Sequence, residues 1–231
     1  MTDERIALYY TRCPVPTASG LAFQRGLFEP AFADSSYEVR NLTELGEAHR
    51  NAHYTHSNEF FFREGGGSPP MWARGRGVES VLLGITFMQE LLGIYVRTDD
   101  PAQSVGDLAG RKIALPVWPH LVFNFWRFAA EKGITSALAA HDMGRGDVNF
   151  VDIEEGWDPH ERRQVGRVDR EKSARCEYRG QLQALLASDV DAIFGKGPEA
   201  ALLESEGAGR VRLLYDVRNS PNLEHRVNNS T

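Results

Sequence analysis

Short apolar runs bounded by turn-forming residues recur along the chain. Those rich in β-branched, leucine and aromatic residues predict strands at residues 5–10, 38–43, 81–87, 92–97, 111–117, 148–153, 189–195 and 210–217. Helical patterns lie between several of these runs, at residues 17–33, 124–134 and 178–188. Strands that alternate with helices indicate an α/β protein with a mostly parallel sheet.

Two stretches make this fold class more specific. "DDPAQSVGDLAGRKIALP" and "ALLASDVDAIFGKGPEAALL" resemble segments of solute-binding proteins of the periplasmic type II architecture. The resemblance implies two lobes with a ligand cleft between them: residues 1–96 as lobe one, 97–220 as lobe two, and 221–231 as the start of a return to lobe one. Because that fold completes lobe one with further elements, we expect the sequence to lack the C-terminal part of lobe one.

Composition excludes several classes of function. The 231 residues carry a formal net charge of −6 with both signs interspersed, so neither a nucleic-acid nor a membrane partner is expected. The opening "MTDERIALYY" lacks the pattern of a secretory signal, and the apolar stretch around "SVLLGITFMQELLGIYV" is interrupted by polar residues, which predicts a cytoplasmic protein.

Cofactor and metal signatures are also missing from the sequence. His49, His53 and His56 lie close together, but their spacing does not match a metal site and no second ligand cluster accompanies them, so no metal is expected. Two distant cysteines argue against a disulfide framework. No phosphate-binding glycine loop or flavin or nicotinamide motif is present, and no organic cofactor is expected.

Cys13 directly follows the first predicted strand and precedes the first predicted helix. In an open parallel sheet this position lies at the carboxyl end of the strand, where ligands bind. We expect the N-terminus of the following helix, which begins near Thr17, and the neighbouring Arg12 to favour the thiolate. The alternative is that Cys13 is a small buried hydrophobic residue.

Two short segments resemble the active-site segments of the 2'-hydroxybiphenyl-2-sulfinate desulfinase family, which acts in dibenzothiophene desulfurisation. The first is "YTRCPVP", with a tyrosine, a small hydroxyl residue and "CPVP" in the family's order. The second is "HYTHSNEFFFREGGGSPP", where His53 precedes Arg63 by the family's spacing, Gly66 follows, and a double proline closes the segment. The runs "LLGITF", "GIYVRTDDP", "DLAGRKIAL" and "DVDAIF" then follow in the corresponding order, so the resemblance covers most of the chain.

The resemblance implies a cysteine-dependent, cofactor-free enzyme that cleaves an aryl C–S bond and releases sulfite. Its catalytic residues would be Cys13, His53 and Arg63, and Thr11 and Gly66 would help to bind the substrate. The planar fork of Arg63 suits two sulfinyl oxygens, and a glycine backbone can offer an N–H to an oxyanion. Whether Cys13 donates a proton or attacks the sulfinate sulfur is left open. The expected partner is a small aromatic sulfinate, and a monomer is expected.

Some residues depart from the family's pattern, which leaves the identity of the arene open. Arg12 replaces a neutral amide, and the triple phenylalanine and the pair Gly67 and Ser68 also differ. An aryl pocket would need aromatic walls, although aromatic residues at such positions can equally be plain core. The candidates are Phe60, Phe61, Trp72, Phe123 and Trp126. The alternative function is a receptor of the solute-binding type that holds a sulfonate, a sulfinate or another small organic anion without turnover.

Overall fold

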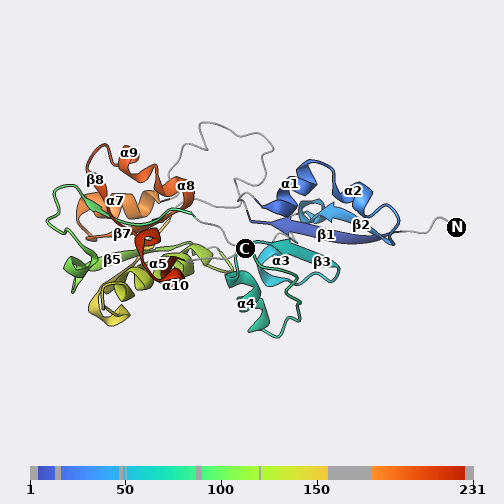
Figure 1. The fold of residues 1–231 in the computed structure, drawn as a ribbon, viewed down its shortest axis with the longest axis horizontal. Coiled ribbons are helices and arrows are strands. Elements are labelled where there is room, and N and C mark those ends of the chain that lie inside the picture. The colour runs from blue at the N-terminus through green and yellow to red at the C-terminus, as the bar shows by residue number, and fades with distance from the viewer. Residues whose placement is uncertain are drawn as a thin grey trace. The chain divides into compact units, whose positions relative to one another are not determined.

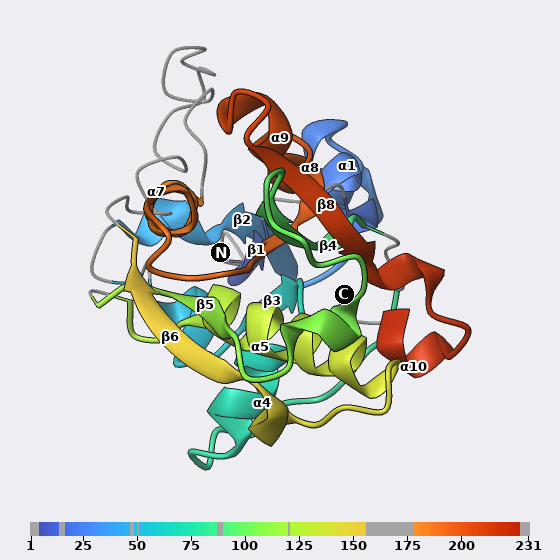
Figure 2. The ribbon, with the colours of Figure 1, turned by 90° about the vertical axis from the view of Figure 1, so that its left-hand side faces the viewer.

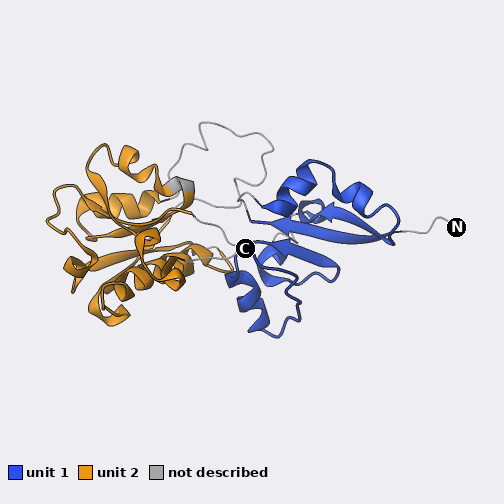
Figure 3. Ribbon diagram, viewed as in Figure 1, with its two compact units in different colours: residues 1–88, 229–231 blue, residues 89–228 orange. Residues whose placement is uncertain are grey.

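The computed structural model describes residues 5–13, 17–46, 49, 51–86, 90–119, 121–155 and 178–226. The chain forms two compact units, residues 1–88 with 229–231 and residues 89–228 (Figure 3). The lobe boundary expected after residue 96 therefore falls inside the second unit. Residues 221–226, which we expected to begin a return to lobe one, also belong to the second unit.

The first unit is built on a three-stranded parallel sheet in the order β2-β1-β3. Its strands are β1 (Ile6–Arg12), β2 (Tyr37–Asn41) and β3 (Phe61–Glu64). Helices α1 (Ala18–Gln24) and α2 (Phe28–Ala31) lie on one side of the sheet, and α3 (Ala52–Thr55) and α4 (Ser68–Arg74) lie on the other (Figure 1). A short 3-10 segment, Leu42–Leu45, follows β2.

Aromatic residues hold α1 and α2 against the sheet. The ring of Tyr10 on β1 lies 5.4 Å from that of Phe23 and 5.5 Å from that of Phe28, measured between centroids. Tyr10 is 1% exposed and also contacts Phe62 of β3 at 5.0 Å. The residues of β1 and β3 that point to this side are therefore committed to the core of the first unit, and their neighbours must face the other side.

The sequence-based elements of the first unit are partly wrong. The helix expected over residues 17–33 is broken at Gly26, whose φ of 66° ends α1. Strand β3 was not predicted, because its apolar run is short and its partner β1 is distant in sequence. The strand expected at 81–87 is not formed over 81–86: these residues have no regular structure, and Val81 and Leu83 are 83% and 86% exposed. Residue 87 lies outside the described part of the chain.

The second unit contains a mixed sheet. Its strands are β4 (Leu92–Arg97), β5 (Lys112–Val117), β6 (Asn149–Glu154), β7 (Ile193–Lys196) and β8 (Val211–Asp216). β5 pairs in parallel with β6, and β4 lies antiparallel between β7 and β8. A parallel bridge between Ile113 and Ala192 joins the two groups, with a hydrogen bond of 2.9 Å from Ala114 N to Ala192 O. The strand order is thus β6-β5-β7-β4-β8, and Figure 2 shows β6 and β8 at opposite edges.

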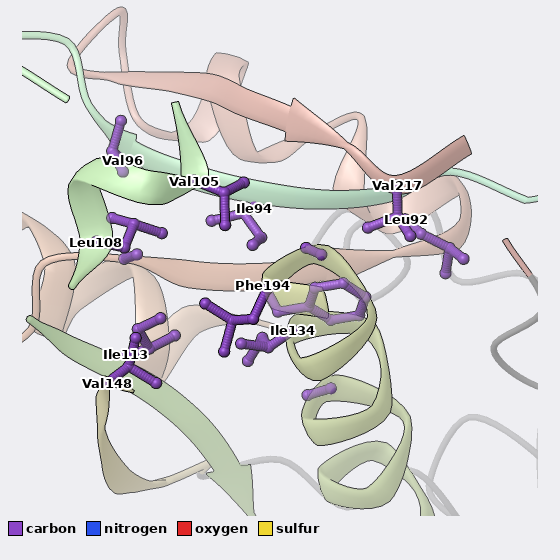
Figure 4. Packing of buried hydrophobic residues seen from close by; sticks show 14 of the residues in the cluster. Leu92, Ile94, Val96, Val105, Leu108, Ile113, Ile134, Val148, Phe194 and Val217 are labelled. Atoms are coloured by element: carbon purple, nitrogen blue, oxygen red, sulfur yellow. The ribbon is translucent and has the colours of Figure 1, made fainter. Parts of the chain in front are cut away.

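Alternation along these strands divides the core of the second unit between two helices. Ile113, Ile94 and Phe194 point toward α5 (Phe125–Ala139), where Figure 4 shows them packed against Ile134. Ala114, Tyr95 and Ile193 point the other way, toward α7 (Arg179–Ala187). Shorter elements complete the unit: α8 (Gly197–Ala200), α9 (Leu203–Glu206), α10 (Leu223–Arg226) and the 3-10 segments Val105–Leu108, Arg145–Asp147 and Val217–Asn219.

The contact between α5 and the sheet requires a glycine. A Cβ added at Gly133 would lie 2.1 Å from Cζ of Phe194, closer than two non-bonded carbon atoms can approach. The sequence is dense in charged residues over 154–175, and of this interval the structure describes only Glu154 and Glu155. Among the helices that the structure describes, none combines the length and apolar character that a membrane crossing needs.

Candidate active site

Strand alternation directs Thr11 and Cys13 to the face of the first sheet that is opposite to α1 and α2. Tyr10 packs on the α1 side, so its neighbour Thr11 and, two residues further, Cys13 face away from it. In the pairing of β1 with β3, Thr11 stands opposite Arg63 and Tyr9 stands opposite Phe61. Residues directly opposite each other in a sheet point to the same face, so Thr11, Cys13, Phe61 and Arg63 share one surface.

Three side chains converge on one another at this surface. Arg63 donates a hydrogen bond from Nη2 to Cys13 Sγ at 3.1 Å. The Nε2 atom of His53 lies 3.9 Å from the same sulfur, and its Nδ1 lies 3.0 Å from Thr11 Oγ1. Since His53 is only 1% exposed, its ring is held by the hydroxyl at one nitrogen and meets the thiol at the other. This is the relation between a nucleophile or acid, a base and a group that orients the base.

A backbone hydrogen bond positions Cys13 at the end of the ladder between β1 and β3. Cys13 lies one residue beyond β1, yet its N–H still donates to Glu64 O at 3.0 Å, which extends the ladder between β1 and β3. Arg63 is fixed at its other nitrogen, because Nη1 donates to Gly66 O at 3.1 Å. The backbone of Cys13 and the guanidinium of Arg63 are therefore both anchored at the end of β3.

Gly65 is a site residue that the sequence analysis missed. A Cβ placed there would lie 2.5 Å from Cys13 Sγ and 2.7 Å from Arg63 Nη2. Any side chain at this position would push apart the two groups that meet at the site. The available signal was the position of the first glycine of the "GGG" run, directly after the strand that carries Arg63.

The two groups expected to favour the Cys13 thiolate make other contacts in the structure. Arg12 points to the opposite face of the sheet, where its Cδ would lie 2.6 Å from a Cβ added at Gly20 of α1. The N-terminus of α1 does not address the sulfur either. Gly20 N donates to Thr17 Oγ1 at 3.0 Å, and Ser19 N donates to the Glu64 carboxylate at 2.8 Å. The cation beside the sulfur is Arg63.

The remaining predicted site residues are placed as follows. Phe61 lies on the same face as Arg63, two residues earlier on β3. Gly66 contacts Arg63 through its carbonyl oxygen; donation from its N–H to a substrate stays a prediction. Pro14 to Pro16 of the "CPVP" segment lie outside the described residues. No group of three or more His, Cys, Asp or Glu side chains that could bind a metal occurs in the described ranges.

Trp126 belongs to the second unit, on α5. Its ring lies 6.5 Å from that of Trp118 and 6.3 Å from that of Tyr178, between centroids. The ammonium of Lys196 lies 5.8 Å from the centroid of the Trp126 ring and forms an ion pair with Glu90. The role of Trp126 as a substrate-binding residue stays a prediction.

A second buried titratable group lies at the end of β6. The carboxyl group of Glu155 accepts hydrogen bonds from Gly180 N at 2.7 Å and from Gln181 N at 3.1 Å, at the start of α7. Burial raises the pKa of Glu155 to about 7, against the lowering effect of these bonds. Sequence reasoning gave no signal for it, because Glu155 sits in a run of charged residues that resembles a solvated loop.

The chain is similar to known proteins in both sequence and fold. No family model matches the chain. The chain is 29% identical over 245 residues to a 2'-hydroxybiphenyl-2-sulfinate desulfinase from Rhodococcus erythropolis. The alignment covers 94% of this chain and 64% of the relative, so the chain spans less than two thirds of the length of that relative.

Solved structures extend the likeness to the fold. A mutant of the desulfurization enzyme DszB in complex with biphenyl-2-sulfinic acid matches with a TM-score of 0.64 at 24% identity, over 98% of this chain and 68% of that one. The periplasmic aliphatic sulphonate binding protein SsuA from Escherichia coli matches with a TM-score of 0.55 at 20% identity, over 95% and 59%. The predicted fold class, two-lobed and similar to type II periplasmic binding proteins, is confirmed, as is the resemblance to the desulfinases.

Proposed function

We propose that this protein is a cysteine-dependent, cofactor-free aromatic sulfinate desulfinase that cleaves an aryl C–S bond and releases sulfite. The observation that carries the proposal is the sulfur of Cys13, which lies between the guanidinium of Arg63 at 3.1 Å and the imidazole of His53 at 3.9 Å. The likeness to 2'-hydroxybiphenyl-2-sulfinate desulfinases supports the choice of reaction.

The anionic sulfinate group would bind at Arg63. A guanidinium can donate two parallel hydrogen bonds to two oxygens, and it stays charged at any working pH. The Thr11 and Cys13 side chains flank it on the neighbouring strand. The substrate's sulfur would then lie against Cys13, with the arene directed toward the Phe61 side of the same surface.

Two routes balance the chemistry. In the first, the Cys13 thiol protonates the ring carbon, the C–S electron pair stays with that carbon, and sulfur dioxide leaves and hydrates to sulfite. In the second, the Cys13 thiolate attacks the sulfinate sulfur and forms an S–S bond while the departing aryl carbon takes a proton from His53. Water then cleaves the S–S bond, which releases sulfite and restores the thiolate. Neither route changes the oxidation state of an external partner.

His53 would serve either route as the proton reservoir. Its Nε2 faces the sulfur, and its other nitrogen is held by Thr11. Restoring the Cys13 thiol in the first route, or protonating the aryl carbon in the second, would need a proton that this nitrogen can carry.

The direct test is sulfite release from 2'-hydroxybiphenyl-2-sulfinate by the purified protein. Cys13→Ser should abolish turnover, because a hydroxyl is both a weaker acid and a weaker nucleophile than a thiol. Replacing the other cysteine, Cys176→Ser, provides the matched control and should leave turnover intact. Sulfite release that survives in Cys13→Ser would refute the proposed chemistry.

A receptor function is the second candidate, favoured by the likeness to a sulphonate-binding protein. In that case Arg63 would hold a sulfonate, sulfinate or other small organic anion without reaction. Binding of the sulfinate with no release of sulfite, together with equal binding by Cys13→Ser, would favour the receptor.

We place the protein in the cytoplasm, since a catalytic thiol needs a reducing compartment. A monomeric state and the absence of nucleic-acid and membrane partners stay predictions.

A further inference from the structure

His56 is a second histidine on the face that carries the candidate site. It ends α3 as the C-cap residue in the left-handed conformation, with φ of 53° and ψ of 33°. Glycine or asparagine adopts this conformation more readily, and a larger side chain there costs about 1–2 kcal/mol. The imidazole packs against Phe61, with ring centroids 5.7 Å apart. The imidazole therefore stands at a position where the backbone does not favour it.

The surroundings of His56 keep its ring neutral. Burial, followed by the positive charge of Arg63, lowers the pKa of His56 from 6.5 to about 4. At neutral pH the imidazole carries one N–H donor and one acceptor nitrogen. Such a ring can bind a neutral hydroxyl in either direction without adding a second positive charge beside the guanidinium.

One nitrogen of this ring lacks a partner. Nε2 of His56 is shielded from solvent and makes no hydrogen bond with any part of the chain that the structure describes. Leaving a buried polar atom unpaired costs about 1–3 kcal/mol. Backbone strain and an unpaired nitrogen thus occur in the same residue, beside Arg63. A partner that arrives with the ligand would offset this cost.

The neighbours of His56 suggest what that partner is. His56 contacts Phe61 and lies near the charge of Arg63, which follows Phe61 by two residues on β3. In 2'-hydroxybiphenyl-2-sulfinate the sulfinate and the hydroxyl are both ortho to the bond that joins the rings, so the two groups lie close together, and His56 stands beside both Phe61 and Arg63. A sulfinate on one ring held at Arg63 would bring a hydroxyl on the second ring toward the Phe61 side.

We propose that His56 is a specificity-determining residue, whose Nε2 forms a hydrogen bond with a hydroxyl group on the second ring of a biaryl sulfinate. The proposal rests on the proposed function of the same site. It predicts that this chain distinguishes a hydroxylated biaryl sulfinate from the same compound without the hydroxyl, and that His56 is responsible for the difference.

The test compares two ligands and measures binding by calorimetry in the Cys13→Ser background, which removes turnover. The ligands are 2'-hydroxybiphenyl-2-sulfinate and biphenyl-2-sulfinate. His56→Phe keeps an aromatic ring and removes both nitrogens. It should weaken binding of the hydroxylated ligand about tenfold, the effect of one hydrogen bond of about 1.4 kcal/mol, and change binding of the other ligand less than twofold. His56→Asn, which suits the left-handed backbone and removes the ring, should give the same selective loss if His56→Phe fails to fold.

Equal weakening of both ligands, no weakening of either, or no binding of either sulfinate would overturn this inference. Its failure is distinguishable from failure of the proposed function, which is measured by sulfite release with Cys13 intact. Selective weakening of the hydroxylated ligand in the His56 variants, together with no sulfite release when Cys13 is intact, would refute the desulfinase and keep the role of His56. A protein that releases sulfite equally from both compounds, with and without His56, would keep the desulfinase and refute the role of His56.

Discussion

Gly65→Ala is the most direct perturbation of the candidate site, because it adds one methyl group between the two groups that meet there. The added carbon would lie 2.5 Å from Cys13 Sγ and 2.7 Å from Arg63 Nη2. Non-bonded carbon contacts are comfortable at about 3.5–4.0 Å, so the neighbours must move by about 1 Å. A misplacement of about 1 Å at a reacting centre can lower a rate about 100-fold. The expected fall in kcat/KM for sulfite release is therefore about 100-fold, or about 2.7 kcal/mol of transition-state stabilisation.

The assay pairs sulfite release with the rate at which iodoacetamide alkylates Cys13, since the second readout reports on the sulfur even without turnover. Gly75→Ala is the matched control in the same unit. There the nearest atoms to an added Cβ are backbone oxygens of Met71 and Trp72, both at 3.5 Å, and the helical φ of −60° accommodates alanine. The control should retain activity and unfold at the wild-type denaturant concentration or above it. Wild-type kcat/KM together with a wild-type alkylation rate in Gly65→Ala would refute the geometry of the site.

Three further predictions concern charge and orientation. Arg63→Lys keeps a positive charge without the planar fork and should raise KM for the sulfinate about tenfold. Arg63→Ala, which also removes the charge, should raise KM by at least another factor of about ten. Equal KM values in the two variants would exclude bidentate binding. Thr11→Val removes the hydroxyl that orients His53 and should lower kcat about tenfold with little change in KM. Thr11→Ser keeps a hydroxyl and should have a kcat near that of the wild type. Steady-state kinetics of the wild type and the two variants test this orienting role. The pKa of Glu155 is about 7 in the folded chain, against 4.5 for an ordinary glutamate in the unfolded chain. Between these two pH values the folded state binds more protons than the unfolded state, so the free energy of unfolding falls as the pH rises through this range. Urea unfolding between pH 5 and pH 8 should show wild type losing on the order of 3 kcal/mol relative to Glu155→Gln, and a pH-independent difference would refute the shift.

The share of the secondary structure that the sequence predicts differs between the two units. In the second unit each predicted strand and helix is formed, although the helix expected over 124–134 extends to Ala139 and the strand expected from residue 189 begins at Ile193. In the first unit, the residues at 81–86 have the composition of a strand but stay exposed, and β3 forms from a short run that gave no signal. A strand needs a partner to satisfy its backbone, and that partner is chosen by distant parts of the chain.

What the sequence determined by itself is the set of chemical groups and their likeness to a desulfinase: the cysteine after the first strand, and a histidine and an arginine at a fixed spacing before a glycine run. What only the tertiary structure decided is which of the nearby groups face the sulfur. Pairing of β1 with β3 sets Arg63 against Cys13, turns Arg12 to the other face, and makes Gly65 the glycine that the site requires. The reason is that side chains alternate across a sheet, so the face on which each residue lies depends on the strand register, and the register is set by contacts between residues about 50 positions apart.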